Sequence, residues 1–176
     1  MFKVGDMVMY GANGVCEVTD ISTQKFAGMD SARQYYTLAP LFEKCVIHAP
    51  VDRVKVAMRP VISKQHAQEL IEMIPSLEVR PYHGKGVSEV SEHYKAAIKT
   101  FALKDLLEVT LSIYAKKAEL EGEKRKFGAV DEQFMRQAQD LLFGELSVAL
   151  AMPIEEVPGY VEGKFEQVLG AKEQLP

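Results

Sequence analysis

The stretch FKVGDMVMYGANGVCEVTDI, residues 2–21, decides the fold of the first part of the chain. Two valine-rich runs flank the sequence GANG at 11–14, and glycine and asparagine tolerate the positive φ that a tight turn needs. We therefore expect a β-hairpin here. Three more runs of strand type follow, separated by loops with glycine or proline: RQYYTLAP, KCVIHAP and RVKVAMRP. Five short strands predict a small, strongly bent sheet or barrel whose edges a partner can pair with.

From residue 63 onward the apolar residues recur at helical spacing. Ser63 and Ser88 are the expected N-caps of the first two helices. The last helix is expected to start at Pro153 and to be broken or bent near Pro158 and Gly159. The predicted helices cover residues 63–74, 88–101, 103–120, 129–151 and 153–170.

These two patterns predict the fold class α+β with two domains. Residues 1–60 form the small bent β-sheet or barrel, and residues 61–176 form an all-α helical bundle. Apolar residues make up 47% of the chain, which is enough for packed cores. No run approaches the roughly 20 apolar residues of a membrane helix, and the N-terminus does not resemble a signal peptide. We therefore expect a cytoplasmic protein without a membrane partner.

The formal net charge is −4 at pH 7, and it is unevenly distributed. Residues 1–60 carry seven basic and six acidic side chains, residues 61–139 carry twelve of each, and residues 140–176 carry two basic and seven acidic ones. A protein that held DNA by charge alone would be more basic. Any contact with nucleic acid must then be local or assisted by a partner.

Enzymatic chemistry has little support in the sequence. There is no glycine-rich phosphate loop, no nucleophile elbow, and no pair of carboxylates with a histidine nearby. Cys16 and Cys45 lie in valine-rich runs and are expected to be buried thiols. The odd spacing from Cys45 to His48 sends the two side chains to opposite faces of a strand, so they cannot share a metal. We expect no enzyme activity, no cofactor and no metal.

The basic side chains gather in a few places. Lys95 and Lys99 are four residues apart and share one face of the second helix, and Lys124, Arg125 and Lys126 follow the third helix. Phosphate binding is one interpretation. Ordinary solubilising charge is the other, because glutamates are interspersed around residues 119–123.

With this layout, the chain resembles the CarD/CdnL family of bacterial transcription regulators over residues 2–170. The opening FKVGDMVMYGANGVCEVTDI is similar to the start of that family, YHGKGVSEVSEHYKAAIKTF resembles the loop and helix before its DNA-contacting face, and AVDEQFMRQAQDLLFGELSVALAMP resembles a later helix. The resemblance implies a Tudor-like N-terminal module that binds the β subunit of RNA polymerase. It also implies a helical domain that contacts promoter DNA near the −10 element and tunes the open complex.

The resemblance also implies which residues make these contacts. The positions that match basic polymerase contacts of the family are Gln24 and His48, flanked by Lys25 and Ile47, and neither matching position is arginine here. Family members act mostly as monomers, while an exposed edge strand would allow a domain-swapped dimer.

The expected DNA surface departs from the family. Actinobacterial members place a tryptophan wedge where this chain has Val90, and this chain has no tryptophan. Glu92 and His93 replace the basic pair that follows, so the attraction to phosphate is weaker. Val90 and Tyr94 have a second interpretation as core residues. The expected DNA contacts are Val90, His93, Lys95, Lys99, Lys124, Arg125 and Lys126.

Two functions remain open at this stage. One is a non-enzymatic transcription regulator that docks on polymerase and touches promoter DNA weakly. The other is a polymerase-bound adaptor whose acidic helical domain recruits another protein rather than DNA.

Overall fold

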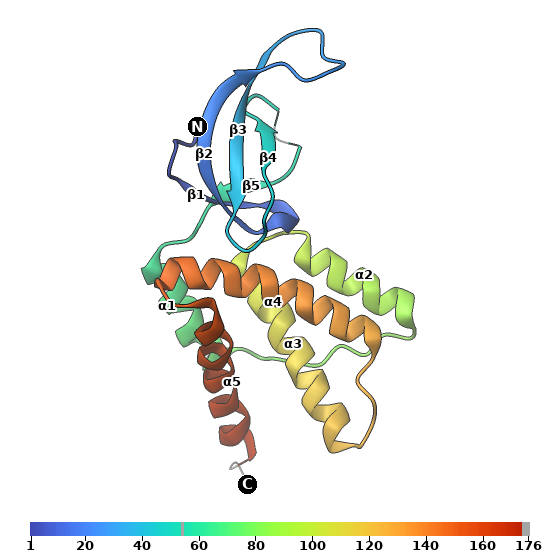
Figure 1. Ribbon diagram of the computed structural model, residues 1–176. Helices are drawn as coiled ribbons and strands as arrows, with labels where there is room; N and C mark the ends of the chain where they lie inside the picture. The colour runs from blue at the N-terminus through green and yellow to red at the C-terminus, as the bar shows by residue number, and fades with distance from the viewer. Residues whose placement is uncertain (54, 174–176) are drawn as a thin grey trace. The chain divides into compact units, whose positions relative to one another are not determined.

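A five-stranded antiparallel sheet forms the first part of the protein, and five α-helices form the second (Figure 1). The computed structural model describes residues 1–53 and 55–173. The chain divides into two compact units, Met1–Val61 and Ile62–Pro176. The α+β fold class with a β part followed by a helical part is therefore confirmed.

The sheet follows from the hairpin at the start of the chain. Its strands are β1 Met7–Tyr10, β2 Val15–Gln24, β3 Arg33–Pro40, β4 Ile47–Pro50 and β5 Met58–Pro60, and their order is β4-β3-β2-β1-β5. The turn between β1 and β2 is a short 3-10 segment, Gly11–Asn13, followed by Gly14. Gly11 has φ +49°, and a Cβ atom there would lie 2.5 Å from Val56 Cγ1. Glycine is thus required both by the backbone and by the neighbouring side chain.

An irregularity at Thr19 changes the facing of the second half of β2. Val18 pairs with Leu38 and Asp20 pairs with Thr37, so Thr19 is left without a partner in the register. Its hydroxyl donates to the Thr37 carbonyl oxygen at 3.1 Å. Such a bulge shifts the side-chain alternation by one. Regular alternation of the β2 side chains between the two faces therefore ends at Thr19.

One face of the sheet packs into a core of buried side chains. Half-buried neighbours such as Ile21 and Ile47 pack against this core. Its members are Val8, Tyr10, Cys16, Val18, Tyr36, Leu38 and Ala49.

The helical unit is built around α4. The helices are α1 Lys64–Met73, α2 Val87–Ile98, α3 Leu103–Gly122, α4 Ala129–Leu150 and α5 Val157–Glu173. Helix α4 contacts each of the other four (Figure 1). In residues 1–53 and 55–173, no helix combines the length and apolar character that crossing a lipid bilayer requires.

One of the three predicted helix signals, Ser88, needs correction. The Ser63 hydroxyl does accept from the His66 N–H at 3.1 Å, as expected of an N-cap. Helix α2, however, begins at Val87 after an extended Gly86, so Ser88 lies inside the helix and is not its cap. The helix expected from Pro153 is interrupted just before Pro158, because a 3-10 turn at Ile154–Glu156 precedes α5, and this proline lies in the first turn of α5, where its missing N–H would have no helical partner.

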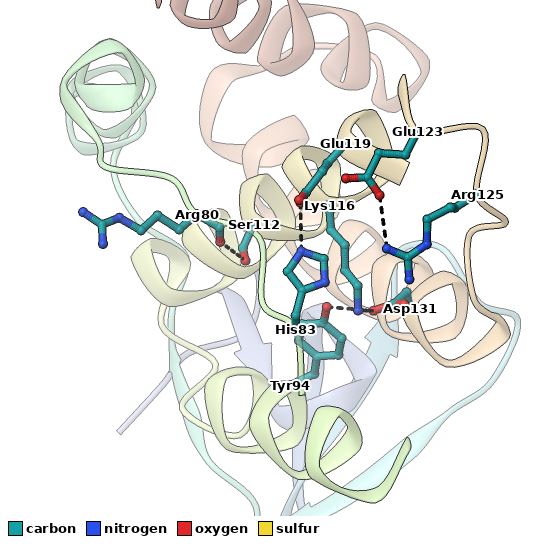
Figure 2. Close-up of polar contacts among 9 residues, drawn as sticks. All are labelled: Arg80, His83, Tyr94, Ser112, Lys116, Glu119, Glu123, Arg125 and Asp131. Atoms are coloured by element: carbon teal, nitrogen blue, oxygen red, sulfur yellow. Dashed lines mark hydrogen bonds and ion pairs between the residues drawn. The ribbon is translucent and has the colours of Figure 1, made fainter. Parts of the chain in front are cut away.

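A buried ionic triad joins three helices of this unit (Figure 2). The Asp131 carboxylate of α4 accepts from the Tyr94 hydroxyl of α2 at 2.8 Å and from the Lys116 ammonium of α3 at 2.9 Å. Tyr94 is fully buried, and Lys116 and Asp131 are each 7% exposed. Burial and the adjacent carboxylate raise the pKa of Tyr94, so its hydroxyl remains a donor.

The extended segment 77–86 is bound to α3 at two points (Figure 2). The Ser112 hydroxyl donates to the Arg80 carbonyl oxygen at 2.7 Å. Farther along, His83 Nε2 lies 2.8 Å from the Glu119 carboxylate. These bonds fix a segment that the sequence predicts only as a loop.

We expect Asp131→Ala to lower the free energy of unfolding by about 3–5 kcal/mol, because it leaves a buried ammonium and a buried hydroxyl without an acceptor. Chemical denaturation followed by far-ultraviolet circular dichroism would measure the loss. The matched control is Glu132→Ala, which removes only the exposed ion pair with Arg136 and should cost less than about 1 kcal/mol. Equal losses in the two variants would contradict a structural role of the triad.

Candidate functional site

The outer face of the sheet, opposite the core, combines residues from three strands. The bulge at Thr19 places Ser22 and Gln24 of β2 on this face, opposite Tyr35 and Arg33 in the register. On β4, His48 pairs with Thr37 of β3. Alternate residues of a strand share a face, so Gln24 and His48 lie on the same side of the sheet although they are 24 residues apart.

Phe26 covers this face and contacts two rings. Its centroid lies 5.0 Å from that of Tyr35 with an interplanar angle of 87°, and 5.3 Å from that of His48 at 51°. The Tyr35 hydroxyl meets the Met29 sulfur at 3.3 Å, which ties the β2–β3 connection to the sheet. Phe26 remains 38% exposed. We call Phe26, Tyr35 and His48 the outer aromatic cluster.

The four residues expected to bind polymerase occupy different environments. Lys25 and His48 are exposed, and Gln24 is half-buried with its amide donating to the Ser22 hydroxyl at 2.9 Å. Ile47 faces the other way and packs against the core. Sequence reasoning missed Phe26, whose only signal is an aromatic residue directly after Gln24 and Lys25.

Strand β4 is an edge of the sheet. The Val51 N–H donates to the Gln34 carbonyl oxygen at 3.0 Å, and Ala49, two residues earlier, pairs with Tyr36. By antiparallel alternation, His48 directs its N–H and C=O away from β3. No further strand pairs with this edge among the described residues. His48 thus offers both its ring and its backbone to a partner.

The two cysteines differ, and the prediction that both are buried is wrong for Cys45. Cys16 is fully buried on the core face, and burial raises the pKa of its thiol to about 11. Cys45 is exposed because it lies in the loop that precedes β4, where its sulfur is 3.9 Å from a Glu43 carboxylate oxygen. In the part of the chain that the structure describes, no three histidine, cysteine, aspartate or glutamate side chains gather as metal ligands would.

In the helical unit, Val90 and His93 have structural contacts. Val90 is 8% exposed and belongs to the buried side of α2, in agreement with its second interpretation. The His93 ring stacks on Tyr82 with centroids 3.6 Å apart and planes within 6°. Burial in this stack lowers the pKa of His93, so it is neutral near pH 7 and does not attract phosphate electrostatically.

Lys95 and Lys99 border a narrow groove between α2 and α4, which we call the α2–α4 groove. Both lysines are exposed and form no ion pair among the described residues. The groove has a volume of about 250 Å³. It is lined by Lys95, Ile98, Lys99, Phe101, Phe134 and Gln137.

The second basic cluster lies in the connection between α3 and α4. Lys124 adopts φ +55° after the helix end, and the Arg125 N–H donates to the Leu120 carbonyl oxygen at 2.7 Å. The Arg125 guanidinium pairs with Glu123 at 3.1 Å (Figure 2). Lys126 is exposed. Arg125 is therefore engaged in a local ion pair, whereas Lys95 and Lys99 have none within residues 1–53 and 55–173.

A comparison with known protein families matches residues 2–62 to the CarD-like/TRCF RID domain. The match spans nearly all of the first unit and none of the helices. The five-stranded sheet, with its exposed edge and outer aromatic cluster, is therefore similar to a domain of this type. The match supports the CarD-like part of the resemblance at the level of this domain.

We expect the pKa of the His93 imidazole to lie below its ordinary value of about 6.5, because the Tyr82 ring excludes water from one side of it. The side-chain resonances of His93, followed by NMR between pH 4 and pH 8 (about two units either side), would measure it. Tyr82→Ala should raise the pKa toward the ordinary value. A titration that is the same in both proteins would contradict the stacking as the cause.

Proposed function

We propose that this chain is a non-enzymatic transcription regulator that docks on the β subunit of RNA polymerase through its first unit. Its helical unit then contacts promoter DNA near the −10 element through Lys95 and Lys99 and modulates the stability of the open complex. The observation that carries the proposal is the match of residues 2–62 to the CarD-like/TRCF RID domain, because such domains bind the polymerase β subunit.

The docking surface in this proposal is the outer aromatic cluster together with the β4 edge. Aromatic rings that are partly exposed and held by neighbours often anchor protein interfaces, because they bury much area and lose little entropy. The backbone of His48 can extend the sheet onto a partner strand, while Pro50 lacks the N–H that a longer pairing would use. Gln24 and Lys25 border this surface and supply polar contacts at its rim.

The DNA surface in this proposal centres on the α2–α4 groove. Lys95 and Lys99 are free of ion pairs among the described residues, and Lys124 and Lys126 add exposed charge from a neighbouring connection. Val90 is buried and contributes through packing, and the exposed His93 is neutral and adds no charge to this surface. A few cations in an acidic unit give weak binding, so we expect DNA contact only when polymerase holds the unit beside the promoter.

The adaptor hypothesis remains the second candidate. It is favoured by the charge of residues 140–176, which carry two basic and seven acidic side chains. This charge repels DNA and would attract a basic protein surface instead. Footprinting of the promoter with and without the protein separates the two, since an adaptor leaves the DNA upstream of the −10 element unprotected.

We expect Phe26→Ala combined with His48→Ala to weaken binding to the cognate RNA polymerase by about tenfold or more, as is typical for loss of anchoring aromatic side chains. Biolayer interferometry with immobilised polymerase would measure the affinity. Phe42→Ala is the matched control, because Phe42 is 50% exposed in the same unit but lies outside the cluster. If the control weakens binding as much as the double variant, the outer aromatic cluster is not the docking surface.

We expect Lys95→Glu combined with Lys99→Glu to abolish the effect of the protein on open-complex lifetime while leaving polymerase affinity unchanged. The reversed charges would repel the phosphates that the wild-type lysines attract. Lys64→Glu combined with Lys104→Glu changes the net charge equally at exposed positions of the same unit and should retain the effect. A retained effect in the Lys95 and Lys99 variant would favour the adaptor hypothesis.

A further inference from the structure

A second groove lies between α2, α3 and the extended segment that begins at Leu77, and we call it the α2–α3 groove. Its volume is about 750 Å³, within the range of roughly 300–1,000 Å³ that is usual for binding sites. The bond from the Ser112 hydroxyl to the Arg80 carbonyl oxygen fixes the wall that the segment forms. Lys95 and Lys99 do not line this groove, so it is separate from the proposed DNA surface.

Four apolar side chains line the groove. Val109 of α3 is 5% exposed and belongs to the core of the helical unit, so its position is firmly held. Leu77, Val79 and Ala97 are half-buried around it. An apolar lining of this kind covers the aliphatic part of an occupant while a charged end reaches the rim.

The charged side chains of the groove are mostly acidic. Glu78, Asp105 and Glu108 line it, and Arg80 is the one basic group among the residues that do. Arg80 pairs with Glu78 at 3.3 Å, which cancels both charges. The Arg80 side chain also extends away from Ser112 and α3, so it leaves the carboxylates of α3 uncovered (Figure 2).

Asp105 and Glu108 therefore give the groove its charge. They are three residues apart and share one face of α3. The Asp105 carboxylate accepts from the Thr100 hydroxyl at 2.6 Å, and it has no ion pair within residues 1–53 and 55–173. Glu108 is 3.8 Å from the exposed Lys104 ammonium, which is a loose pair. Both carboxylates can accept hydrogen bonds from an entering cation.

The segment that forms one wall also has unpaired backbone groups. Its Val79 N–H donates to the Leu77 carbonyl oxygen at 3.1 Å. In the part of the chain that the structure describes, the Glu78 N–H and C=O and the Val79 C=O have no hydrogen-bond partner. An extended backbone with free groups can pair with another extended chain. The wall therefore favours a peptide over a small molecule.

We propose that the α2–α3 groove binds an extended basic segment of a partner protein, whose backbone pairs with residues 78–79 and whose arginine reaches Asp105 and Glu108. The aliphatic stem of an arginine suits the apolar lining, and its planar guanidinium has five N–H donors for the two carboxylates. His93 also lines the groove, and it is neutral near pH 7, so it does not repel the cation.

This partner goes beyond the proposed function, because it occupies a surface of the helical unit that neither polymerase docking nor DNA contact uses. DNA is the poorer occupant, since two carboxylates of α3 would repel its phosphates. A small organic cation could reach the same carboxylates but would leave the backbone of residues 78–79 unpaired. The extended peptide satisfies both features at once.

The test uses the whole chain alone, without polymerase or DNA, so its outcome is independent of the proposed function. The probe is a short fluorescein-labelled peptide in which arginine alternates with valine, which places all the guanidinium groups on one side of an extended chain. Its control has citrulline in place of arginine, which keeps the shape and removes the charge. In fluorescence anisotropy at low ionic strength, we expect the arginine peptide to bind about tenfold or more tightly than the citrulline peptide.

Two pairs of variants locate the binding. Asp105→Asn combined with Glu108→Gln should weaken binding of the arginine peptide by about tenfold or more, whereas Glu155→Gln combined with Glu156→Gln removes equal charge at exposed positions outside the groove and should not. Ala97→Phe fills the groove and should also abolish binding. Ala96→Phe adds the same ring at the neighbouring exposed position, which does not line the groove, and should retain it. Circular dichroism would establish that all four variants fold.

Three results would overturn the inference. Equal affinity for the arginine and citrulline peptides would show that the carboxylates do not bind the cation. Unchanged binding by a folded Ala97→Phe variant would place the peptide elsewhere on the protein. Displacement of the peptide by free argininamide at an equal concentration would make the occupant a small cation, and pairing with the backbone of residues 78–79 would be wrong.

Discussion

The carboxylate of Asp131 is the point on which the arrangement of the helical unit depends. It lies in the first turn of α4 and satisfies the Tyr94 hydroxyl of α2 and the Lys116 ammonium of α3 at the same time. Burying an ammonium is expensive unless its acceptor is in place, so the three helices can pack closely only in this register. The Phe134 ring, one turn along α4, then meets Tyr94, and the α2–α4 groove forms beside it. The surface is thus a consequence of the buried contact.

The sheet has a comparable constraint in the bulge at Thr19. Without it, the residues after Val18 would keep their alternation, Ile21 would face outward and Gln24 would face the core. One unpaired residue corrects this: it turns Ile21 inward and moves Gln24 to the face that carries His48. A single irregularity therefore packs Ile21 against the core and turns the end of β2 toward the face that carries the outer aromatic cluster.

Much of the fold could be predicted from the sequence, and the errors have physical causes. Strand and helix positions follow from apolar spacing and from glycine and proline, which act locally. Burial of Asp131 and Lys116, and of Glu145, which is fully buried on α4, could not be predicted, because charged residues carry no apolar signal and their partners are distant in sequence. The bulge was missed because a single unpaired residue leaves no recognisable change in the apolar and polar pattern of so short a strand. Phe26 was missed because loop aromatics show no period, and Cys45 was misjudged because its valine-rich run is partly loop.

The uneven charge of the chain is consistent with a division of labour between its units. In the proposed function, docking through the first unit would raise the local concentration of the second beside the promoter to the order of millimolar. At that concentration a surface with two exposed lysines would be occupied although it would bind DNA poorly alone. The acidic side chains of residues 140–176 would then suppress binding to other DNA, so that contact depends on the polymerase. Weak intrinsic affinity in the helical unit would be a source of specificity, and a more basic surface would lose it.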